Sequence, residues 1–168
     1  MPISDQYIQK IISEHGKQPL AEIFEVRHYP QGFVFGPHSH PNIEINFVQK
    51  GSCAMRFGND IVTYKKHDCM IVYPDVEHYF FVDKGRASLI QLEFRMDIFP
   101  ELKVNSQLED HLVFLHRVLT NSQRHIKIIN HKKLTQLLEN IVTELNEKRQ
   151  NYKLLTRLHY GELFILIS

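Results

Sequence analysis

The sequence is poor in the features that mark several classes of protein. Tryptophan is absent from its 168 residues, there are two cysteines, and the 20 basic and 19 acidic side chains leave a formal net charge of +1. A chain without an excess of positive charge lacks the electrostatic footprint of a protein that binds nucleic acid or a membrane surface. Cys53 and Cys69 stand far apart in apolar segments, which excludes a close-spaced metal or redox motif and favours reduced, buried thiols.

Long apolar runs are missing as well. No segment approaches the roughly 18 apolar residues that a membrane span requires. Residues 1–10 lack the apolar core of a signal peptide. We therefore expect a cytoplasmic protein without a membrane partner, and the length fits one domain that can bury its own core.

Between residues 22 and 94 the apolar pattern has the period of two that is typical of β-strands. Polar turns separate the apolar segments, and the turn at Gly58, Asn59 and Asp60 favours a hairpin because these residues tolerate positive φ. Strands are predicted at 22–29, 33–35, 43–48, 52–57, 61–64, 69–73, 78–82 and 87–94. Short strands at this spacing predict an antiparallel sandwich or barrel.

Helical patterns flank this region. We predict an amphipathic helix at 4–14, a second helix at 107–119, a third that begins at the N-cap Asn130 and continues to Leu145, and a fourth over 152–168. Residues 1–20 are thus an N-terminal arm, 21–100 the barrel and 101–168 a helical dimerisation or linker region. The leucine stripe of the third helix needs a partner, either its own sheet or a second copy, and we favour a homodimer. The apolar end at Ser168 suggests either a chain cut from a longer protein or contact with a second copy.

The main candidate site centres on His38, His40 and Glu44. Side chains alternate across a strand, so these three residues, at even offsets, would share one face if the chain stays extended. His78 begins a later strand, and Asn46 adds a polar group on the same face as Glu44. Imidazoles with a carboxylate suit a divalent transition metal or a polar cavity that binds a small ligand, and both alternatives stay open at this point.

The spacing of the glycine, histidine and glutamate residues carries a family resemblance. The sequence is similar to the first cupin motif at each of its defining positions. These are Gly32, His38, His40, Glu44 and Gly51, which are separated by five, one, three and six residues. The second cupin motif is weaker. Its histidine is present as His78, but other residues stand at its remaining positions: His67, Tyr73, Asp75 and Val82.

The sequence also resembles the N-terminal sensor domain of AraC-family transcription regulators, from about residue 22 to residue 145. His40, Glu44 and Gly51 are followed by a turn aspartate, an apolar strand, a proline and a histidine, here Asp68, 70–72, Pro74 and His78. The resemblance implies a mainly β fold, the cupin double-stranded β-helix, followed by C-terminal α-helices. It also implies an effector-sensing and dimerisation domain without catalysis, whose DNA contact comes only through a C-terminal helix-turn-helix domain that is missing here.

The expected effector is a small polar molecule such as a sugar, and the predicted ligand-binding residues are His40, Glu44, Asn46, Tyr73 and His78. Tyr64, Tyr73, Tyr79 and Phe80 are candidates for an aromatic wall or for core packing. The preferred expectation is that the domain holds no cofactor. The alternative is a divalent Fe, Mn, Ni or Zn ion on His38, His40, Glu44 and His78, in a small cupin enzyme acting as an oxygenase or isomerase. His111, His116, His125, His131 and His159 are interpreted as solvated or packing residues on helices and their connections.

Overall fold

The computed structural model describes residue 21, residues 23–95 and residues 124–167. The helices predicted at 4–14 and 107–119 lie outside these residues. The strands are β1 Ile23–Tyr29, β2 Val34–His38, β3 Ile43–Lys50, β4 Ser52–Phe57, β5 Asp60–Lys65, β6 Cys69–Val72, β7 His78–Phe81, β8 Ala87–Phe94 and β9 His125–Ile128, and the helices are α5 Lys132–Glu147 and α6 Tyr152–Ile167. No helix among the described residues is long and apolar enough to cross a membrane.

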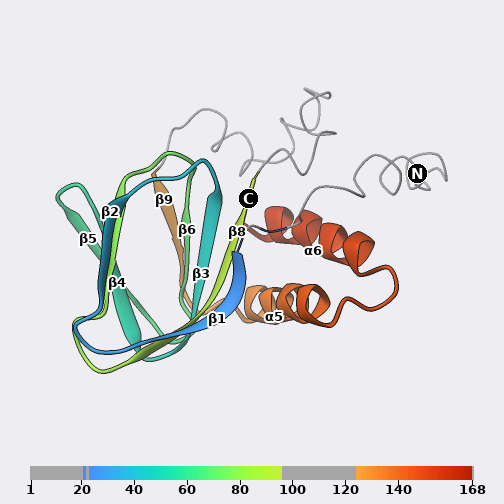
Figure 1. Ribbon diagram of the computed structural model, residues 1–168, viewed down its shortest axis with the longest axis horizontal. Coiled ribbons are helices and arrows are strands. Elements are labelled where there is room, and N and C mark those ends of the chain that lie inside the picture. The colour runs from blue at the N-terminus through green and yellow to red at the C-terminus, as the bar shows by residue number, and fades with distance from the viewer. Residues whose placement is uncertain (1–20, 22, 96–123, 168) are drawn as a thin grey trace.

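The strands form two antiparallel sheets that face each other (Figure 1). One has the order β1-β8-β3-β6-β9 and the other the order β2-β7-β4-β5. From β1 to β8 the chain crosses to the other sheet after each strand except β4, which pairs with β5 in a hairpin, and this is the arrangement of a jelly roll. The predicted fold, a cupin double-stranded β-helix followed by C-terminal helices, is confirmed.

Strand β3 divides its side chains between the two faces of its sheet, as its sequence predicts. Ile43, Ile45 and Phe47 point outward into a cluster shared with the helices. Val48 points inward and packs in the core between the two sheets, on the same side as Glu44 and Asn46. Both faces are therefore buried, and the side chains of Glu44 and Asn46 lie in the interior of the sandwich.

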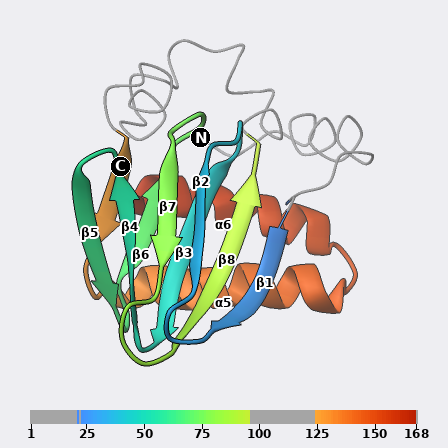
Figure 2. The same ribbon diagram turned by 60° about the vertical axis from the view of Figure 1, so that its left-hand side comes forward.

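Helices α5 and α6 cover the outer face of the five-stranded sheet (Figure 2). The leucine stripe of α5 is buried against the chain's own strands, with Leu134, Leu138 and Ile141 each no more than 1% exposed. The interpretation of this stripe as a homodimer face is therefore wrong. An apolar sheet face lies within reach of the same chain, so the stripe buries its surface there without a second copy.

The start of α5 also differs from its prediction. His131, not Asn130, is the N-cap, and its Nδ1 accepts a hydrogen bond from the backbone N–H of Leu134 at 3.1 Å. Asn130 has a left-handed backbone conformation with φ of 45°. It forms the turn before the helix, a position that asparagine tolerates well.

Strand β9 was not predicted. It pairs with β6, with Ile126 opposite Ile71 and Ile128 opposite Cys69, and it extends the sheet beyond the predicted barrel boundary at residue 100. His125 thus begins a strand, although the sequence places it among helices and their connections. Four residues carry too little periodicity to identify a strand whose partner lies far away in sequence.

Gly51 closes β3 at a position that only glycine fits. Its φ is +75°, and a Cβ atom there would lie 1.8 Å from the backbone oxygen of Arg86. This close approach fixes the turn from one sheet to the other. The last position of the cupin-like motif therefore has a steric reason.

Candidate ligand and metal site

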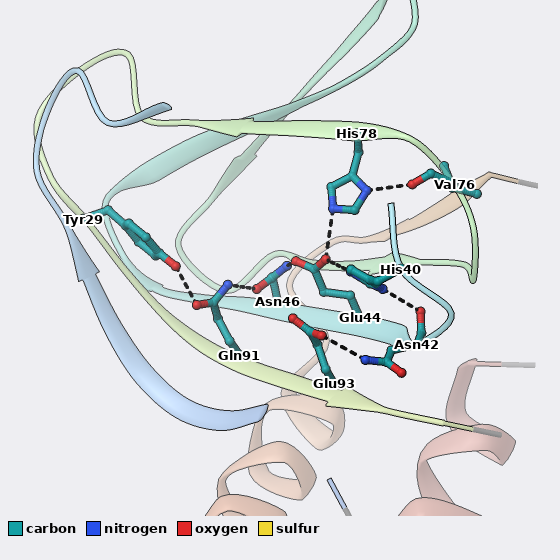
Figure 3. A network of polar contacts seen from close by, with 9 residues as sticks. All are labelled: Tyr29, His40, Asn42, Glu44, Asn46, Val76, His78, Gln91 and Glu93. Carbon is teal, nitrogen blue, oxygen red and sulfur yellow. Dashed lines mark hydrogen bonds and ion pairs between the residues drawn. The ribbon is translucent and has the colours of Figure 1, made fainter. Parts of the chain in front are cut away.

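Four of the predicted side chains come together, and Figure 3 shows three of them, His40, Glu44 and His78. One ligand atom from each of His38, His40, Glu44 and His78 lies within 4.8 Å of the others. His38 ends β2 opposite His78 of β7, whereas Glu44 belongs to β3 in the other sheet. The chain crosses between the sheets at His40, so the cluster forms by this crossing and not on the single extended face that the spacing predicts.

Gly36 allows the two strands that carry His38 and His78 to approach each other. Its φ is +109°, and a Cβ atom there would lie 2.7 Å from the backbone oxygen of His78 and 3.3 Å from Nδ1 of His38. Any side chain at this position would push β2 away from β7. The glycine is therefore part of the site, although it carries no functional group.

Glu44 is the centre of the hydrogen-bond network in Figure 3. Its Oε2 accepts from Nε2 of His40 at 2.9 Å and from Nε2 of His78 at 3.0 Å. The Nδ1 atoms of the same two rings donate to backbone oxygens, of Asn42 at 3.2 Å and of Val76 at 2.8 Å. Both imidazoles thus have their orientation fixed at Nδ1 and direct Nε2 toward one carboxylate oxygen.

A second series of hydrogen bonds reaches the other oxygen of Glu44. Tyr29 donates its hydroxyl to Oε1 of Gln91 at 2.6 Å, and Gln91 donates its amide to Oδ1 of Asn46 at 2.8 Å. Asn46 donates to Oε1 of Glu44. Because every donor in the series points toward Glu44, the network stabilises this residue as a hydrogen-bond acceptor, the role of an ionised carboxylate.

The electrostatics of the cluster follow from these contacts. Burial would raise the pKa of Glu44, but hydrogen bonds from His40 and His78 hold it well below its ordinary value of 4.5. The hydrogen bond to Glu44 raises the pKa of His40 above 6.5 despite burial. Burial lowers the pKa of His38, and the neighbouring His78 adds to this effect. His40 therefore favours the imidazolium form, and His38 favours the neutral form that metals require.

A cavity of about 350 Å³ opens beside the cluster. It is lined by Arg27, Tyr29, Phe33, Phe35, His38, His40, Glu44, Phe80, Gln91 and Glu93. Of the predicted ligand-binding residues, His40 and Glu44 reach its surface, while Asn46 and His78 lie behind it and hold Glu44. The volume is at the lower end of the range for small-molecule sites.

Tyr73 does not line the cavity. It follows Cys69 and Ile71 in alternation, so it packs in the cluster between the five-stranded sheet and the helices, on the opposite face from Glu44. Of the other aromatic candidates, Phe80 lines the cavity and Tyr64 is buried in the core between the sheets. Tyr79 lies beneath the guanidinium of Arg56, 3.9 Å from the ring centroid.

Sequence reasoning missed several residues of the site. Gln91 and Glu93 stand at alternate positions of β8, in a strand whose other residues are mostly apolar. Polar groups on one face of an otherwise apolar strand are a visible signal for a lined cavity. The position of Tyr29 gave no such signal, because a tyrosine at a strand end is common in cores.

The donor set fits a divalent transition metal. Three imidazoles and one carboxylate are the ligand types that such ions prefer. Two of the rings already direct Nε2 toward a shared point, and Nδ1 of His38 is buried with no hydrogen-bond partner in the described part of the chain. An ion would satisfy this atom.

The family model for the AraC-like ligand binding domain matches residues 22–164. The chain belongs to this family. Its predicted resemblance to the sensor domain of AraC-type regulators is thereby confirmed over most of the sequence, including the residues of the cavity. No curated protein matches this AraC-like domain.

Solved structures similar to this AraC-like domain have low sequence identity to it, and one of them is described as a cupin-2 domain protein. A cupin-2 domain protein from Shewanella frigidimarina is 18% identical, with 56% of this chain and 95% of that chain covered and a TM-score of 0.39. A predicted oxalate decarboxylase from Thermotoga maritima is 16% identical, with 56% of this chain and 76% of that chain covered and a TM-score of 0.43. A putative ethanolamine utilization protein from Salmonella typhimurium is 16% identical, with 41% of this chain and 54% of that chain covered and a TM-score of 0.38. The match thus spans about half of that protein's length.

Proposed function

We propose that this domain senses a small polar effector in its cavity, as part of a cytoplasmic AraC-type transcription regulator, and that it catalyses no reaction. The observation that supports this proposal is the buried polar network that ends at an aromatic-walled cavity, in a chain of the AraC-like ligand-binding family. Polar groups inside a core need partners, and a polar ligand supplies them. His40 and Glu44 would contact the effector, with Asn46 and His78 orienting Glu44.

Effector binding acts by stabilising one of two arrangements of the domain. Coupling requires that the effector bind one arrangement more tightly than the other. Strands β3 and β8 carry cavity residues on one face and helix contacts on the other, so a shift of these strands reaches α5 directly. DNA contact is assigned to a helix-turn-helix domain of the parent regulator.

A homodimer is part of the proposal, now through α6 in place of the buried stripe of α5. Helix α6 exposes Leu155, Leu158 and Ile165 by 38%, 56% and 67%. Their spacings of three and seven residues place them on one side of the helix, where a second copy can cover them. In sedimentation velocity, Leu158→Lys should shift the chain to monomer while the exposed Gln136→Lys on α5 leaves it unchanged. A monomer at every concentration of the wild type would remove the dimer from the proposal.

The sensing proposal is tested by thermal denaturation with a panel of neutral sugars, polyols, small amines and small carboxylic acids. We expect at least one class to raise Tm in a saturable way, because a ligand that binds only the folded state stabilises it. Gln91→Met keeps the volume but removes the amide that lines the cavity, and it should reduce the shift. Tyr79→Phe, outside the cavity, is the matched control. A panel without any stabilising class would contradict the proposal.

The alternative function, a metal-dependent cupin enzyme, is favoured by one observation, the cluster of four donor atoms. His38, His40, Glu44 and His78 would hold the ion, which would supply Lewis-acid chemistry. Elemental analysis of untagged protein purified without chelator distinguishes the two functions. About one equivalent of Fe, Mn, Ni or Zn that is lost in His38→Ala would establish the four ligands.

A further inference from the structure

Three aromatic rings gather on the lining of the cavity. Tyr29 lies with its ring centroid 4.7 Å from that of Phe33 and 4.8 Å from that of Phe80, and the rings are tilted by 51° and 53°. Phe33 and Phe80 are 6.1 Å apart. All three rings line the cavity. The three rings together form a surface against which the apolar body of a ligand can pack.

The lining also carries two carboxylates on neighbouring strands. Glu44 and Glu93 stand directly opposite each other in the pairing of β3 with β8, and both line the cavity. Like charges at directly opposed positions of a sheet repel each other. This repulsion and burial both raise the pKa of Glu93, with burial as the larger cause.

Only one of these carboxylates has a salt-bridge partner among the described residues. Glu44 accepts from Nε2 of His40 at 2.9 Å and from Nε2 of His78 at 3.0 Å. Arg27, the permanently charged residue of the lining, forms its ion pair with Glu25 at the protein surface. Glu93 accepts a 3.3 Å hydrogen bond from the neutral amide of Asn42, and no ion pair of Glu93 is found in the described residues. Glu93 thus forms no salt bridge in the described part of the chain, although the charges of His40 and Arg27 lower its pKa without contact.

We propose that the effector is a small organic cation, with an ammonium group at the Glu93 carboxylate and a short apolar body against Tyr29, Phe33 and Phe80. This inference rests on the proposed sensing function and narrows its ligand class. An ammonium group donates hydrogen bonds to Glu93 and relieves its repulsion with Glu44. A neutral sugar supplies hydrogen bonds but no compensating charge, and a ligand carboxylate placed at Glu93 would meet the like charges of Glu93 and Glu44.

Three matched probes test the charge of the ligand. The full chain, treated with chelator and dialysed, is titrated by calorimetry at pH 7 with n-butylammonium chloride, 1-butanol and sodium butyrate, and in parallel with a set of neutral sugars. The three butyl compounds share one body and differ in charge. We expect butylammonium to bind at least about tenfold more tightly than butanol, with weaker binding at high salt, and butyrate to give no heat of binding.

Two variants locate the site. Glu93→Gln preserves the shape but removes the charge, and it should weaken butylammonium binding about tenfold or more, whereas Glu139→Gln on the exposed side of α5 should leave it unchanged. Phe33→Leu removes one ring and should also weaken binding. Circular dichroism checks that each variant is folded, so the Phe33 variant still tests the wall if Glu93→Gln does not fold.

The outcomes separate this inference from the sensing proposal. Stabilisation by neutral sugars without butylammonium binding overturns the organic cation and keeps the sensor. Butylammonium binding that is equal in wild type and Glu93→Gln overturns the assigned position. If no probe of any class binds the folded chain, the inference and the proposed function both fail.

Discussion

Replacing Glu44 separates charge from hydrogen bonding in the buried network. In Glu44→Gln, the amide oxygen takes the place of Oε1 and accepts from Asn46. The amide nitrogen takes the place of Oε2 and has two hydrogens, one for Nε2 of His40 and one for Nε2 of His78. Neutral rings that keep their Nδ1–H bonds to backbone oxygens accept at Nε2. Each hydrogen bond of the wild type therefore has a counterpart in the variant.

The free energies of unfolding follow from this geometry. At pH 8, Glu44→Gln should cost no more than about 1 kcal/mol, because the amide of glutamine gives each neutral ring a donor and no buried group loses its partner. Glu44→Ala leaves the amide of Asn46 and two imidazole nitrogens without their acceptor, at a residue that is 4% exposed. Removing one partner of a buried charged network costs about 3–5 kcal/mol. Urea denaturation of both variants and of Glu139→Gln, an exposed control, measures the difference.

The same variant changes the titration of His40. The hydrogen bond to the Glu44 carboxylate is the largest cause of its raised pKa, and burial opposes it. With a glutamine that donates to Nε2, the pKa of His40 should fall below 6.5, its ordinary value. An NMR titration of the ring protons reports this value. Equal destabilisation by glutamine and alanine, or a His40 pKa that stays raised in Glu44→Gln, would refute the proposed role of the carboxylate.

Three further predictions test the pH response, the turn after β3 and the helix platform. In a double-mutant cycle of His40→Gln and Glu44→Gln, the coupling free energy should be largest between about pH 4.5 and 6.5. The coupling is lost in acid as Glu44, whose pKa is lowered, becomes protonated, and it is lost at higher pH as His40, whose pKa is raised, loses its proton. A coupling free energy that is flat from pH 4 to 9 would contradict this. Gly51→Ala places a Cβ atom 1.8 Å from a backbone oxygen and should lower the free energy of unfolding by more than about 4 kcal/mol in urea denaturation, whereas a cost below about 1 kcal/mol would mean that the turn adjusts. Leu138→Ala should cost about 2–5 kcal/mol and leave the sedimentation coefficient unchanged, because this side chain packs on its own sheet, and a changed oligomeric state would argue against that packing.

Much of the barrel could be predicted from local pattern. Alternation in β3 assigned Ile45 to one face and Glu44 to the other, and the structure confirms both. The cluster of histidines was predicted as well, but through an extended strand that the chain does not form. The residues meet because β2 and β3 belong to different sheets, a fact of topology that spacing along one strand does not contain.

Long-range pairing explains what was missed. Strand β9 exists because β6 offers it an edge far away in sequence, and Tyr29 belongs to the network because β1 lies beside β8. The buried stripe of α5 was assigned to a second copy because periodicity shows that a helix face needs a partner, not which surface supplies it. For α5 the helix itself was identified, and the error concerned only the surface against which it packs. For β9 the strand itself was missed, because its partner lies far away in sequence.

The five-stranded sheet separates two sets of positions by the parity of residue number. In β3 and β8, Glu44, Asn46, Gln91 and Glu93 face the interior, whereas their immediate neighbours Ile45, Phe47, Ile90 and Leu92 support the helices. Substitutions on the interior set can alter which molecule is recognised without disturbing a single helix contact. Such a sheet would let related domains of this family vary the lining of the cavity while the helix-bearing face stays unchanged, and directed evolution of the cavity would then need changes only at alternate codons.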